Sequence, residues 1–285
     1  MPTDPVILRR AAARRLAEAG VASPDFDADE LLAHVLGTTR PGLLLVDAVT
    51  ADQERAYDGL VGRRAAREPL QHLTGSAAFR YVELAVGPGV FVPRPETELL
   101  AGWGVDRACE AAGAGRAPVV VDLCTGSGAI ALAVATEVPS AEVHAVELGE
   151  AAHDWATRNL SGSGVDLRHG DMAGAFPDLD GTVDVVLCNP PYIPLEAFES
   201  VEPEARDHDP ELALFSGADG LDAIRVVEAV AARLLRPGGV VGVEHADVQG
   251  GSAPAVFSGS GRWSDVRDHE DLAGRSRYLT ARLAR

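Results

Sequence analysis

The sequence contains no lysine, because all 25 of its basic residues are arginine. This absence excludes a Schiff-base lysine, a pyridoxal-phosphate anchor and the phosphate-binding lysine of a P-loop. The three cysteines form no CxxC pair, and an odd count does not predict a disulfide framework. Neither an apolar run of about 20 residues nor a signal-peptide pattern is present. We therefore expect a cytoplasmic protein with no membrane partner.

Positive charge is scarce relative to negative charge. The 285 residues include 43 acidic residues against the 25 arginines, which gives a formal net charge of −18. Residues 1–80 carry 10 arginines and 11 acidic residues, whereas residues 81–285 carry 15 arginines and 32 acidic residues. A protein that holds duplex nucleic acid by charge needs a basic face, so we expect no direct nucleic-acid partner.

The first part of the chain shows apolar residues at helical spacing. Three helices are predicted, over residues 6–19, residues 25–37 and about residues 52–67. None of them carries a catalytic pattern. We therefore expect residues 1–75 to form a small helical domain that recognises a substrate.

The pattern changes over residues 76–95. Phe79 to Val86 alternates like a strand, and Gly87-Pro88-Gly89 is typical of a turn. Val90-Phe91-Val92 is predicted to form the returning strand. This segment is therefore expected to be a β-hairpin connector.

Residues 96–285 are predicted to form the main domain, which opens with a helix over residues 96–112. Strands are expected at residues 119–121, 143–146, 183–188 and 240–243. The helices expected between them are at residues 129–137, 151–159 and 221–235. Such alternation predicts an α/β fold with a doubly wound, mostly parallel sheet.

A glycine-rich turn follows the first of these strands. Gly126 and Gly128 allow the backbone to approach a ligand closely, and the next helix offers free N–H groups. Glu147 follows at the end of the next strand, where a carboxylate can accept hydrogen bonds from both hydroxyls of a ribose. Gly126 to Ala131 also matches the G-x-G-x-x-A form of a dinucleotide site. Asp122, just before the turn, instead suits the ammonium group of S-adenosylmethionine.

The motif Asn189-Pro190-Pro191-Tyr192 favours S-adenosylmethionine over a dinucleotide as the cofactor. It follows the strand at residues 183–188 directly, at the edge of the sheet where ligands bind. The Asn189 amide oxygen and the Pro190 carbonyl can converge on a planar NH₂ group, and Tyr192 can pack over that group. Hydrogen bonds to both protons orient such a weakly nucleophilic nitrogen for attack on a sulfonium methyl group. The motif therefore predicts methyl transfer to an amide or an exocyclic amine.

Several motifs together resemble the release factor N5-glutamine methyltransferases. They are Thr74-Gly75, the segment Phe91–Glu98, the glycine-rich turn, the Asn-Pro-Pro-Tyr motif and Glu244-His245. The resemblance covers nearly the whole chain and implies a Rossmann-like class I methyltransferase that uses S-adenosylmethionine. The implied substrate is the side-chain amide, at N5, of the glutamine in the Gly-Gly-Gln motif of class 1 peptide chain release factors. We also expect a monomer.

The resemblance also implies the site residues. Those expected to bind the cofactor are Asp122, Cys124, Thr125, Gly126, Ser127, Gly128, Glu147, Asp171, Met172 and Asn189. Those expected to bind the glutamine amide are Asn189, Pro190, Pro191 and Tyr192, of which Asn189, Pro190 and Tyr192 are the catalytic candidates. Three positions depart from the family pattern: Cys124 replaces a glycine, Glu147 an aspartate, and Met172 an aromatic residue.

The main alternative is an adenine-N6 methyltransferase acting on DNA or RNA, because such enzymes share the Asn-Pro-Pro-Tyr motif. The acidic main domain and the lack of an evident base-reading domain disfavour it. A binding module with a degenerate cofactor site conflicts with the intact motif, and a nicotinamide oxidoreductase lacks a hydride-transfer acid or base. His72, His169 and His208 show no ligand spacing, so we expect surface or loop positions and no metal ion. The resemblance makes residues 195–217 a loop beside the substrate cleft.

Overall fold

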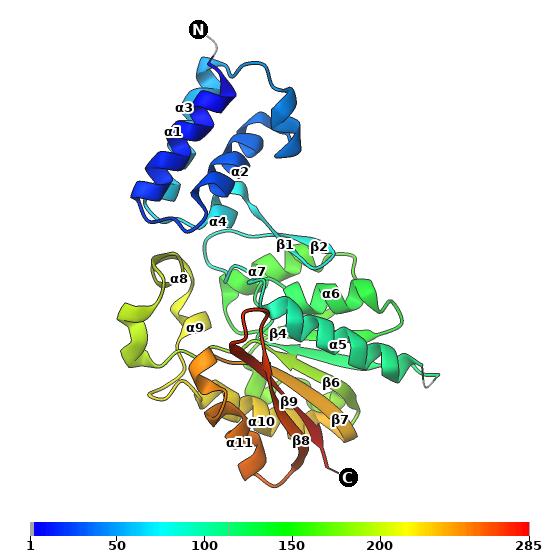
Figure 1. Ribbon diagram of the computed structural model, residues 1–285. Helices are drawn as coiled ribbons and strands as arrows, with labels where there is room; N and C mark the ends of the chain where they lie inside the picture. Colours follow the sequence, from blue (N-terminus) through cyan, green and yellow to red (C-terminus); the bar gives the residue numbers. More distant parts are fainter. Residues whose placement is uncertain (1–2, 114, 285) are drawn as a thin grey trace. The chain divides into compact units, whose positions relative to one another are not determined.

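The computed structural model describes residues 3–113 and 115–284 (Figure 1). These residues divide into two compact units, of which the first contains the chain up to Ser76 together with Glu202–His208. The second contains Ala77–Val201 and the residues from Asp209 onward. The chain therefore passes between the units at three points. Compactness does not show that a part folds by itself, so the three-domain division expected from the sequence remains a prediction.

The first unit is helical, as the apolar periodicity predicts. Its elements are α1 (Pro5–Glu18), α2 (Pro24–Leu36), η1 (Pro41–Leu45), α3 (Ala51–Ala65), α4 (Leu70–Thr74) and α8 (Pro203–His208). The Asp4 side chain caps α1 by accepting a hydrogen bond from the Val6 N–H, and a capping box between Thr50 and Gln53 begins α3. The buried apolar faces of α1 to α4 form one core.

A buried arginine joins three helices of this unit. The Arg64 guanidinium of α3 donates from Nε to Asp27 of α2 at 2.7 Å, and from Nη2 to Glu204 of α8 at 2.9 Å. Arg67 donates to both oxygens of the Glu204 carboxylate, at 2.7 and 2.6 Å. Charge-assisted bidentate pairs are among the stronger hydrogen bonds. They therefore hold α8 against the other helices of the first unit.

Seven strands form the main sheet of the second unit, in the order β5-β4-β3-β6-β7-β9-β8. Their bounds are β3 (Val119–Leu123), β4 (Glu142–Glu147), β5 (Asp166–His169), β6 (Val183–Cys188), β7 (Leu235–Glu244), β8 (Trp263–Glu270) and β9 (Ser276–Leu283). β3 to β7 pair in parallel, whereas β9 pairs antiparallel with both β7 and β8. The predicted α/β fold with a mostly parallel sheet is confirmed.

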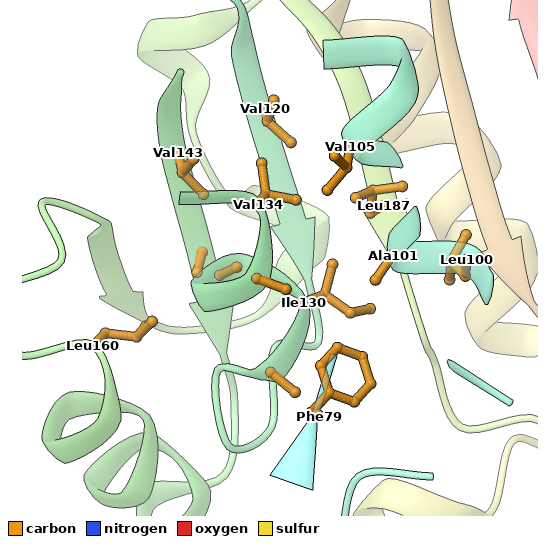
Figure 2. Packing of buried hydrophobic residues seen from close by; sticks show 14 of the residues in the cluster. Phe79, Leu100, Ala101, Val105, Val120, Ile130, Val134, Val143, Leu160 and Leu187 are labelled. Carbon is orange, nitrogen blue, oxygen red and sulfur yellow. The ribbon is translucent and has the colours of Figure 1, made fainter. Parts of the chain in front are cut away.

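Helices cover both faces of this sheet (Figure 1). One face packs against α5 (Thr97–Ala112), α6 (Ala129–Glu137) and α7 (Glu150–Asn159), and the other against α10 (Asp222–Leu234) and α11 (Ser252–Gly259). Because alternate residues of a strand point to opposite faces, Val120 joins the first apolar cluster and Val121 the second. Figure 2 shows the first cluster, which also contains Ile130 of α6 and Phe79.

The connector is a hairpin, but its turn does not lie where the sequence pattern predicts it. β1 (Ser76–Phe79) and β2 (Val82–Ala85) are joined by a short turn that begins at Arg80, whose φ is 50°. The Arg80 guanidinium donates to both carboxylate oxygens of Glu137 on α6, each at 2.6 Å. A turn does form at residues 88–89, but it does not join the strands of the hairpin, and the strand predicted over residues 90–92 is wrong. The contact with Glu137 anchors the hairpin turn at Arg80, and strand alternation does not reveal this contact.

Two further expectations are corrected. Residues 195–217 are not an open loop, because they contain η4 (Leu195–Ser200), α8 and α9 (Glu211–Leu214). His72 is neither at the surface nor in a loop, because it is a buried residue of the helix α4. The other short elements are η2 (Met172–Gly174), η3 (Pro177–Leu179) and η5 (Asp247–Gln249). Of the helices that the structure describes, none has both the length and the apolar character needed to cross a membrane.

Candidate active site

The predicted site residues gather at one edge of the sheet. β3, β4, β5, β6 and β7 run parallel, so their carboxyl ends lie at the same edge. The glycine-rich turn follows β3, Glu147 ends β4, and Asp171 follows β5. Asn189 follows β6, and Glu244 ends β7. Ligands bind at this edge in open α/β sheets.

Asp122 organises the turn after β3. Its Oδ2 accepts hydrogen bonds from the Thr125 hydroxyl at 2.6 Å and from the Ala131 N–H at 3.1 Å. Burial raises the pKa of Asp122 to about 7, with 1% of the residue exposed. Its Oδ1 is also buried and has no hydrogen-bond partner among the residues described. Because an unpaired buried acceptor is costly, an ammonium group of a ligand fits this position.

Glu147 closes the same turn from the neighbouring strand. Its Oε2 accepts a hydrogen bond from the Gly126 N–H at 2.8 Å, and its Oε1 accepts one from the Gly149 N–H at 2.7 Å. Gly126 has a φ of 57°, and a Cβ added there would meet no atom within 4 Å. The space above the turn is therefore open. Each carboxylate oxygen keeps acceptor capacity for a ribose hydroxyl.

Three sulfur-containing side chains lie beside this turn. The Sγ of Cys124 is 3.5 Å from the Sδ of Met172, which begins η2. Burial and a hydrogen bond with Cys124 raise the pKa of the Cys188 thiol. The sulfur atoms therefore connect the ends of β3 and β6. The Asp171 carboxylate accepts a hydrogen bond from the Ala173 N–H at 2.8 Å, so part of its acceptor capacity is used within η2.

Asn159 holds the other side of the turn, and the sequence reasoning missed it. Its Nδ2 donates to the Ser127 carbonyl and to the Ala85 carbonyl, both at 2.9 Å. Its Oδ1 accepts a hydrogen bond from the Ala85 N–H at 2.9 Å. The side chain therefore ties β2 to the glycine-rich turn. Only the rarity of asparagine, present at positions 159 and 189 alone, could have drawn attention to it.

The Asn-Pro-Pro-Tyr motif presents two acceptors. The Nδ2 of Asn189 donates to the Thr97 hydroxyl at 3.2 Å, and Asn189 is half-buried. Within the part of the chain that the structure describes, neither Asn189 Oδ1 nor the Pro190 carbonyl accepts a hydrogen bond. Pro191 is half-buried and Pro190 is buried, so the backbone has little freedom here. Both acceptors remain available to an NH₂ group.

Tyr192 is held by residues far along the chain. Its hydroxyl donates to Glu244 Oε1 at 3.2 Å, and burial raises the pKa of Tyr192. The buried Gln249 donates from Nε2 to the Tyr192 carbonyl at 3.0 Å. A Cβ at Gly220, whose φ is 74°, would lie 2.3 Å from the same carbonyl, so only glycine fits there. The sequence reasoning missed Gln249 and Gly220, because neither belongs to a recognisable motif.

The predicted residues thus fall into two linked groups. The first comprises Asp122, Thr125, Gly126, Gly128 and Glu147, joined by hydrogen bonds of the turn, and Ser127, whose carbonyl accepts from Asn159. Met172 contacts this group through Cys124, whereas Asp171 is hydrogen-bonded within η2. The second comprises the Asn-Pro-Pro-Tyr residues, with Thr97 and Glu244 added by the structure. The thiols of Cys124 and Cys188 connect the two groups.

Known protein families match both parts of the chain. The model of the PrmC N-terminal domain matches residues 8–75, and that of a methyltransferase domain matches residues 120–208. A solved 16S rRNA N2 G1207 methyltransferase from T. thermophilus, in complex with AdoMet and guanosine, has a similar fold with a TM-score of 0.51 and 23% identity. That similarity covers 74% of this chain and 50% of the other.

Curated relatives are similar over most of the sequence. Proteins named release factor glutamine methyltransferase in Streptomyces coelicolor and Mycolicibacterium smegmatis are 61% and 48% identical, each over 96% of both chains. A 4-amino-L-phenylalanine/4-methylamino-L-phenylalanine methyltransferase of Streptomyces pristinaespiralis is 47% identical over 72% of this chain and 70% of its own. The first two match over nearly full length. The chain therefore belongs to the release factor glutamine methyltransferase family.

Proposed function

We propose that this protein transfers a methyl group from S-adenosylmethionine to N5 of the glutamine in the Gly-Gly-Gln motif of class 1 peptide chain release factors. The observation that carries the proposal is the pair of free acceptors, Asn189 Oδ1 and the Pro190 carbonyl, at the carboxyl end of β6. They match the two protons of a primary amide. The full-length relatives support a release factor as the protein that carries this amide.

The turn after β3 fits S-adenosylmethionine, which supplies an electrophilic methyl group when bound. The unpaired Oδ1 of Asp122 suits the ammonium group of its methionine part. Glu147 has acceptor capacity for the ribose hydroxyls, and the open space above Gly126 lets the backbone approach the ligand. Cys124, Met172 and Asp171 would line the rest of the cofactor site.

The residues of the Asn-Pro-Pro-Tyr motif prepare the substrate. An amide nitrogen is a poor nucleophile because its lone pair is delocalised into the carbonyl group. Hydrogen bonds from its two protons to Asn189 and Pro190 orient the NH₂ group and stabilise the positive charge that develops during attack. Tyr192 packs over the planar amide. No strong base is needed before attack, since the nitrogen becomes acidic only once it is alkylated.

Two other substrate classes present a planar NH₂ group. Adenine-N6 methylation is disfavoured by the 32 acidic residues that face 15 arginines over residues 81–285. An aromatic amine is the substrate class named for the relative in Streptomyces pristinaespiralis, which matches only part of the chain. A match to the PrmC N-terminal domain over residues 8–75 favours the release factor.

The decisive experiment uses radiolabelled S-adenosylmethionine. We expect label on a class 1 release factor and none on its variant in which alanine replaces the Gly-Gly-Gln glutamine. Duplex DNA and 4-amino-L-phenylalanine serve as competing substrates. Equal label on the release factor and on its alanine variant would contradict the proposal. Preferential label on the DNA or on 4-amino-L-phenylalanine would contradict it as well.

A variant of the site tests the assignment of the acceptors. Asn189→Ala should abolish transfer, because one of the two acceptors for the amide is removed. Binding of S-adenosylmethionine should remain measurable by calorimetry, since the turn after β3 is unchanged. Persistent turnover would show that Asn189 does not orient the amide.

Four features remain predictions from the sequence and the family resemblance: a monomeric state, a cytoplasmic location, no direct nucleic-acid partner, and a separate helical domain for substrate recognition. Sedimentation at several protein concentrations tests the first. Release-factor binding by a truncated chain that begins at residue 77, where the second unit starts, tests the last. We expect the truncated chain to keep cofactor binding and to lose affinity for the release factor.

A further inference from the structure

Two motif residues that carry the family resemblance have no part in the function described so far. Thr97 lies at the first position of α5, and Glu244 is the last residue of β7. Both are buried, with 4% and 1% of their areas exposed. Buried polar side chains are costly unless they are paired. Their partners therefore indicate what they do.

Their partners are the two ends of the Asn-Pro-Pro-Tyr motif. Thr97 Oγ1 accepts from Asn189 Nδ2 at 3.2 Å, and Glu244 Oε1 accepts from the Tyr192 hydroxyl at 3.2 Å. The Thr97 hydroxyl is also near enough to the Glu244 carboxylate to favour its ionised form, and Glu244 Oε2 is buried with no hydrogen-bond partner among the residues described. The structure therefore shows two hydrogen-bonded pairs, Asn189 with Thr97 and Tyr192 with Glu244, and the Thr97 hydroxyl lies near the carboxylate that joins them electrostatically.

The donor and the acceptor of each hydrogen bond among these four side chains are fixed. An ionised carboxylate can only accept hydrogen bonds, so Glu244 draws the single hydroxyl proton of Thr97 toward itself. Oγ1 of Thr97 then offers only lone pairs to Asn189. The amide of Asn189 satisfies them with its NH₂ group, which leaves its Oδ1 free.

We propose that Thr97 and Glu244 are positioning residues that fix the Asn189 side-chain amide with its nitrogen toward Thr97 and its oxygen toward the substrate. The catalytic meaning of this orientation rests on the function proposed above, whereas the orientation itself is a property of the chain. A reversed Asn189 amide would present its NH₂ group to the NH₂ group of the substrate. One of the two acceptors that the reaction needs would then be lost.

The protonation state of Glu244 controls the orientation of the Asn189 side-chain amide. The groups that face it are Thr97 and Glu96 at the start of α5, Tyr192 after β6, and Arg277 on β9. Burial raises the pKa of Glu244 to about 7, although Thr97, Arg277 and Tyr192 lower it. A protonated Glu244 can itself donate, so the Thr97 proton is no longer held on one side. The orientation should therefore weaken below about pH 7.

Substitutions at Thr97 separate positioning from packing. Thr97→Val keeps the shape but removes the hydroxyl, and we expect kcat to fall roughly 10- to 100-fold. The KM for the release factor and the Kd for S-adenosylmethionine should change less than about threefold. Thr97→Ser restores the hydroxyl and should recover most of kcat. Thr182→Val is the matched control, because it removes the same hydroxyl at a site far from the motif. Thr182 precedes the first residue of β6 and donates to the Leu179 carbonyl, whereas the motif follows the last residue of β6.

A spectroscopic experiment reports on the amide without any substrate. Asn159 and Asn189 are the two asparagines of the sequence, so protein labelled with ¹⁵N-asparagine gives two side-chain NH₂ signals. Asn189→Ala assigns them by removing one. The Asn189 signal should shift with a midpoint near pH 7, and this titration should be absent in Glu244→Gln. The Asn159 signal is an internal reference, since its NH₂ group is held by two backbone carbonyls.

The two measurements give distinguishable outcomes. A pH-independent Asn189 signal that is also unchanged by Thr97→Val overturns the positioning proposal, as does a kcat of Thr97→Val within about twofold of the parent protein. If the parent protein fails to methylate a release factor, the proposed function fails. The NMR titration then still decides whether Thr97 and Glu244 orient Asn189.

Discussion

The carboxylate of Glu147 and the backbone N–H of Gly126 are joined by a hydrogen bond of 2.8 Å. This bond links the last residue of β4 to the turn that follows β3. The same carboxylate accepts from the Gly149 N–H, so both of its oxygens are fixed. Glu147 therefore shapes the cofactor turn in addition to offering acceptors to a ribose.

The first prediction concerns the affinity for S-adenosylmethionine. Glu147→Gln replaces one carboxylate oxygen by an NH₂ group, which cannot accept a hydrogen bond. One backbone N–H of the turn then loses its partner, and one ribose hydroxyl loses its acceptor. A hydrogen bond to a charged group contributes about 1.5–3 kcal/mol, so the Kd should rise roughly 10- to 150-fold.

Calorimetry with S-adenosylmethionine measures this effect. Glu150→Gln is the matched control, because Glu150 is exposed at the start of α7 and the substitution removes the same charge as Glu147→Gln. Its Kd should equal that of the parent protein. Equal affinities for all three proteins would show that Glu147 does not contact the ribose.

The second prediction concerns Cys124, at the position where the family resemblance leads us to expect glycine. Its φ of 58° lies in the left-handed region, which costs a residue with a side chain about 1–2 kcal/mol. Cys124→Gly and Cys124→Ala both lose the sulfur contact with Met172, but only glycine removes the strain. We expect the glycine variant to be more stable than the alanine variant by about 0.5–1 kcal/mol. Urea unfolding of the two variants measures the difference, and a more stable alanine variant would contradict it.

The motif residues of the candidate site could be predicted from the sequence, whereas the residues that hold those motifs in place could not. Four of the five parallel strands, β3, β4, β6 and β7, follow from hydrophobic runs, and the Asn-Pro-Pro-Tyr motif is recognised from neighbouring residues alone. The fifth, β5 (Asp166–His169), was not predicted because its sequence is mostly polar. Asn159 and Gln249 stabilise the glycine-rich turn and the Asn-Pro-Pro-Tyr motif through carbonyl groups far along the chain. Such partners are set by tertiary structure and leave no local pattern.

The same reasoning explains the errors in the connecting segments. Arg80 forms the hairpin turn because Glu137 of α6 anchors its guanidinium, whereas glycine and proline at residues 87–89 gave the stronger local signal. β8 was not predicted because its exposed positions are mostly polar and its register shifts twice. Tertiary contacts override local propensity at both places.

The third prediction concerns pH and stability. Burial raises the pKa of Asp209 to about 6, although Arg94 donates to it at 2.7 Å. In the unfolded chain its pKa is close to 4. Between these values the folded state binds more protons than the unfolded state, so stability should fall as the pH rises from about 4 to about 7. Asp122 and Glu244, each with a pKa of about 7, act in the same direction.

A comparison with Asp209→Asn isolates this contribution. Asparagine does not titrate. Between pH 5 and pH 8 the free energy of unfolding of the variant should therefore fall by about 1–2 kcal/mol less than that of the parent protein. The lowered pKa of His269 opposes the trend equally in both proteins, and the comparison cancels it. Asp207→Asn, at an exposed neighbouring position, should keep the pH dependence of the parent protein. Parallel curves for the parent protein and Asp209→Asn would show that Asp209 ionises normally.

The last prediction concerns the segment by which the chain re-enters the first unit after the Asn-Pro-Pro-Tyr motif. Glu204 accepts hydrogen bonds from both Arg64 and Arg67, whereas the exposed Glu202 lies 3.6 Å from Arg67 and forms no hydrogen bond with it. Glu204→Gln removes the charge that holds α8 in place, at a cost of about 1–3 kcal/mol in local opening. Amide hydrogens of α8 should exchange about 5- to 150-fold faster by mass spectrometry. Glu202→Gln should leave exchange unchanged, and equal acceleration in both variants would show that general charge, and not the Arg64 and Arg67 contacts, anchors this segment.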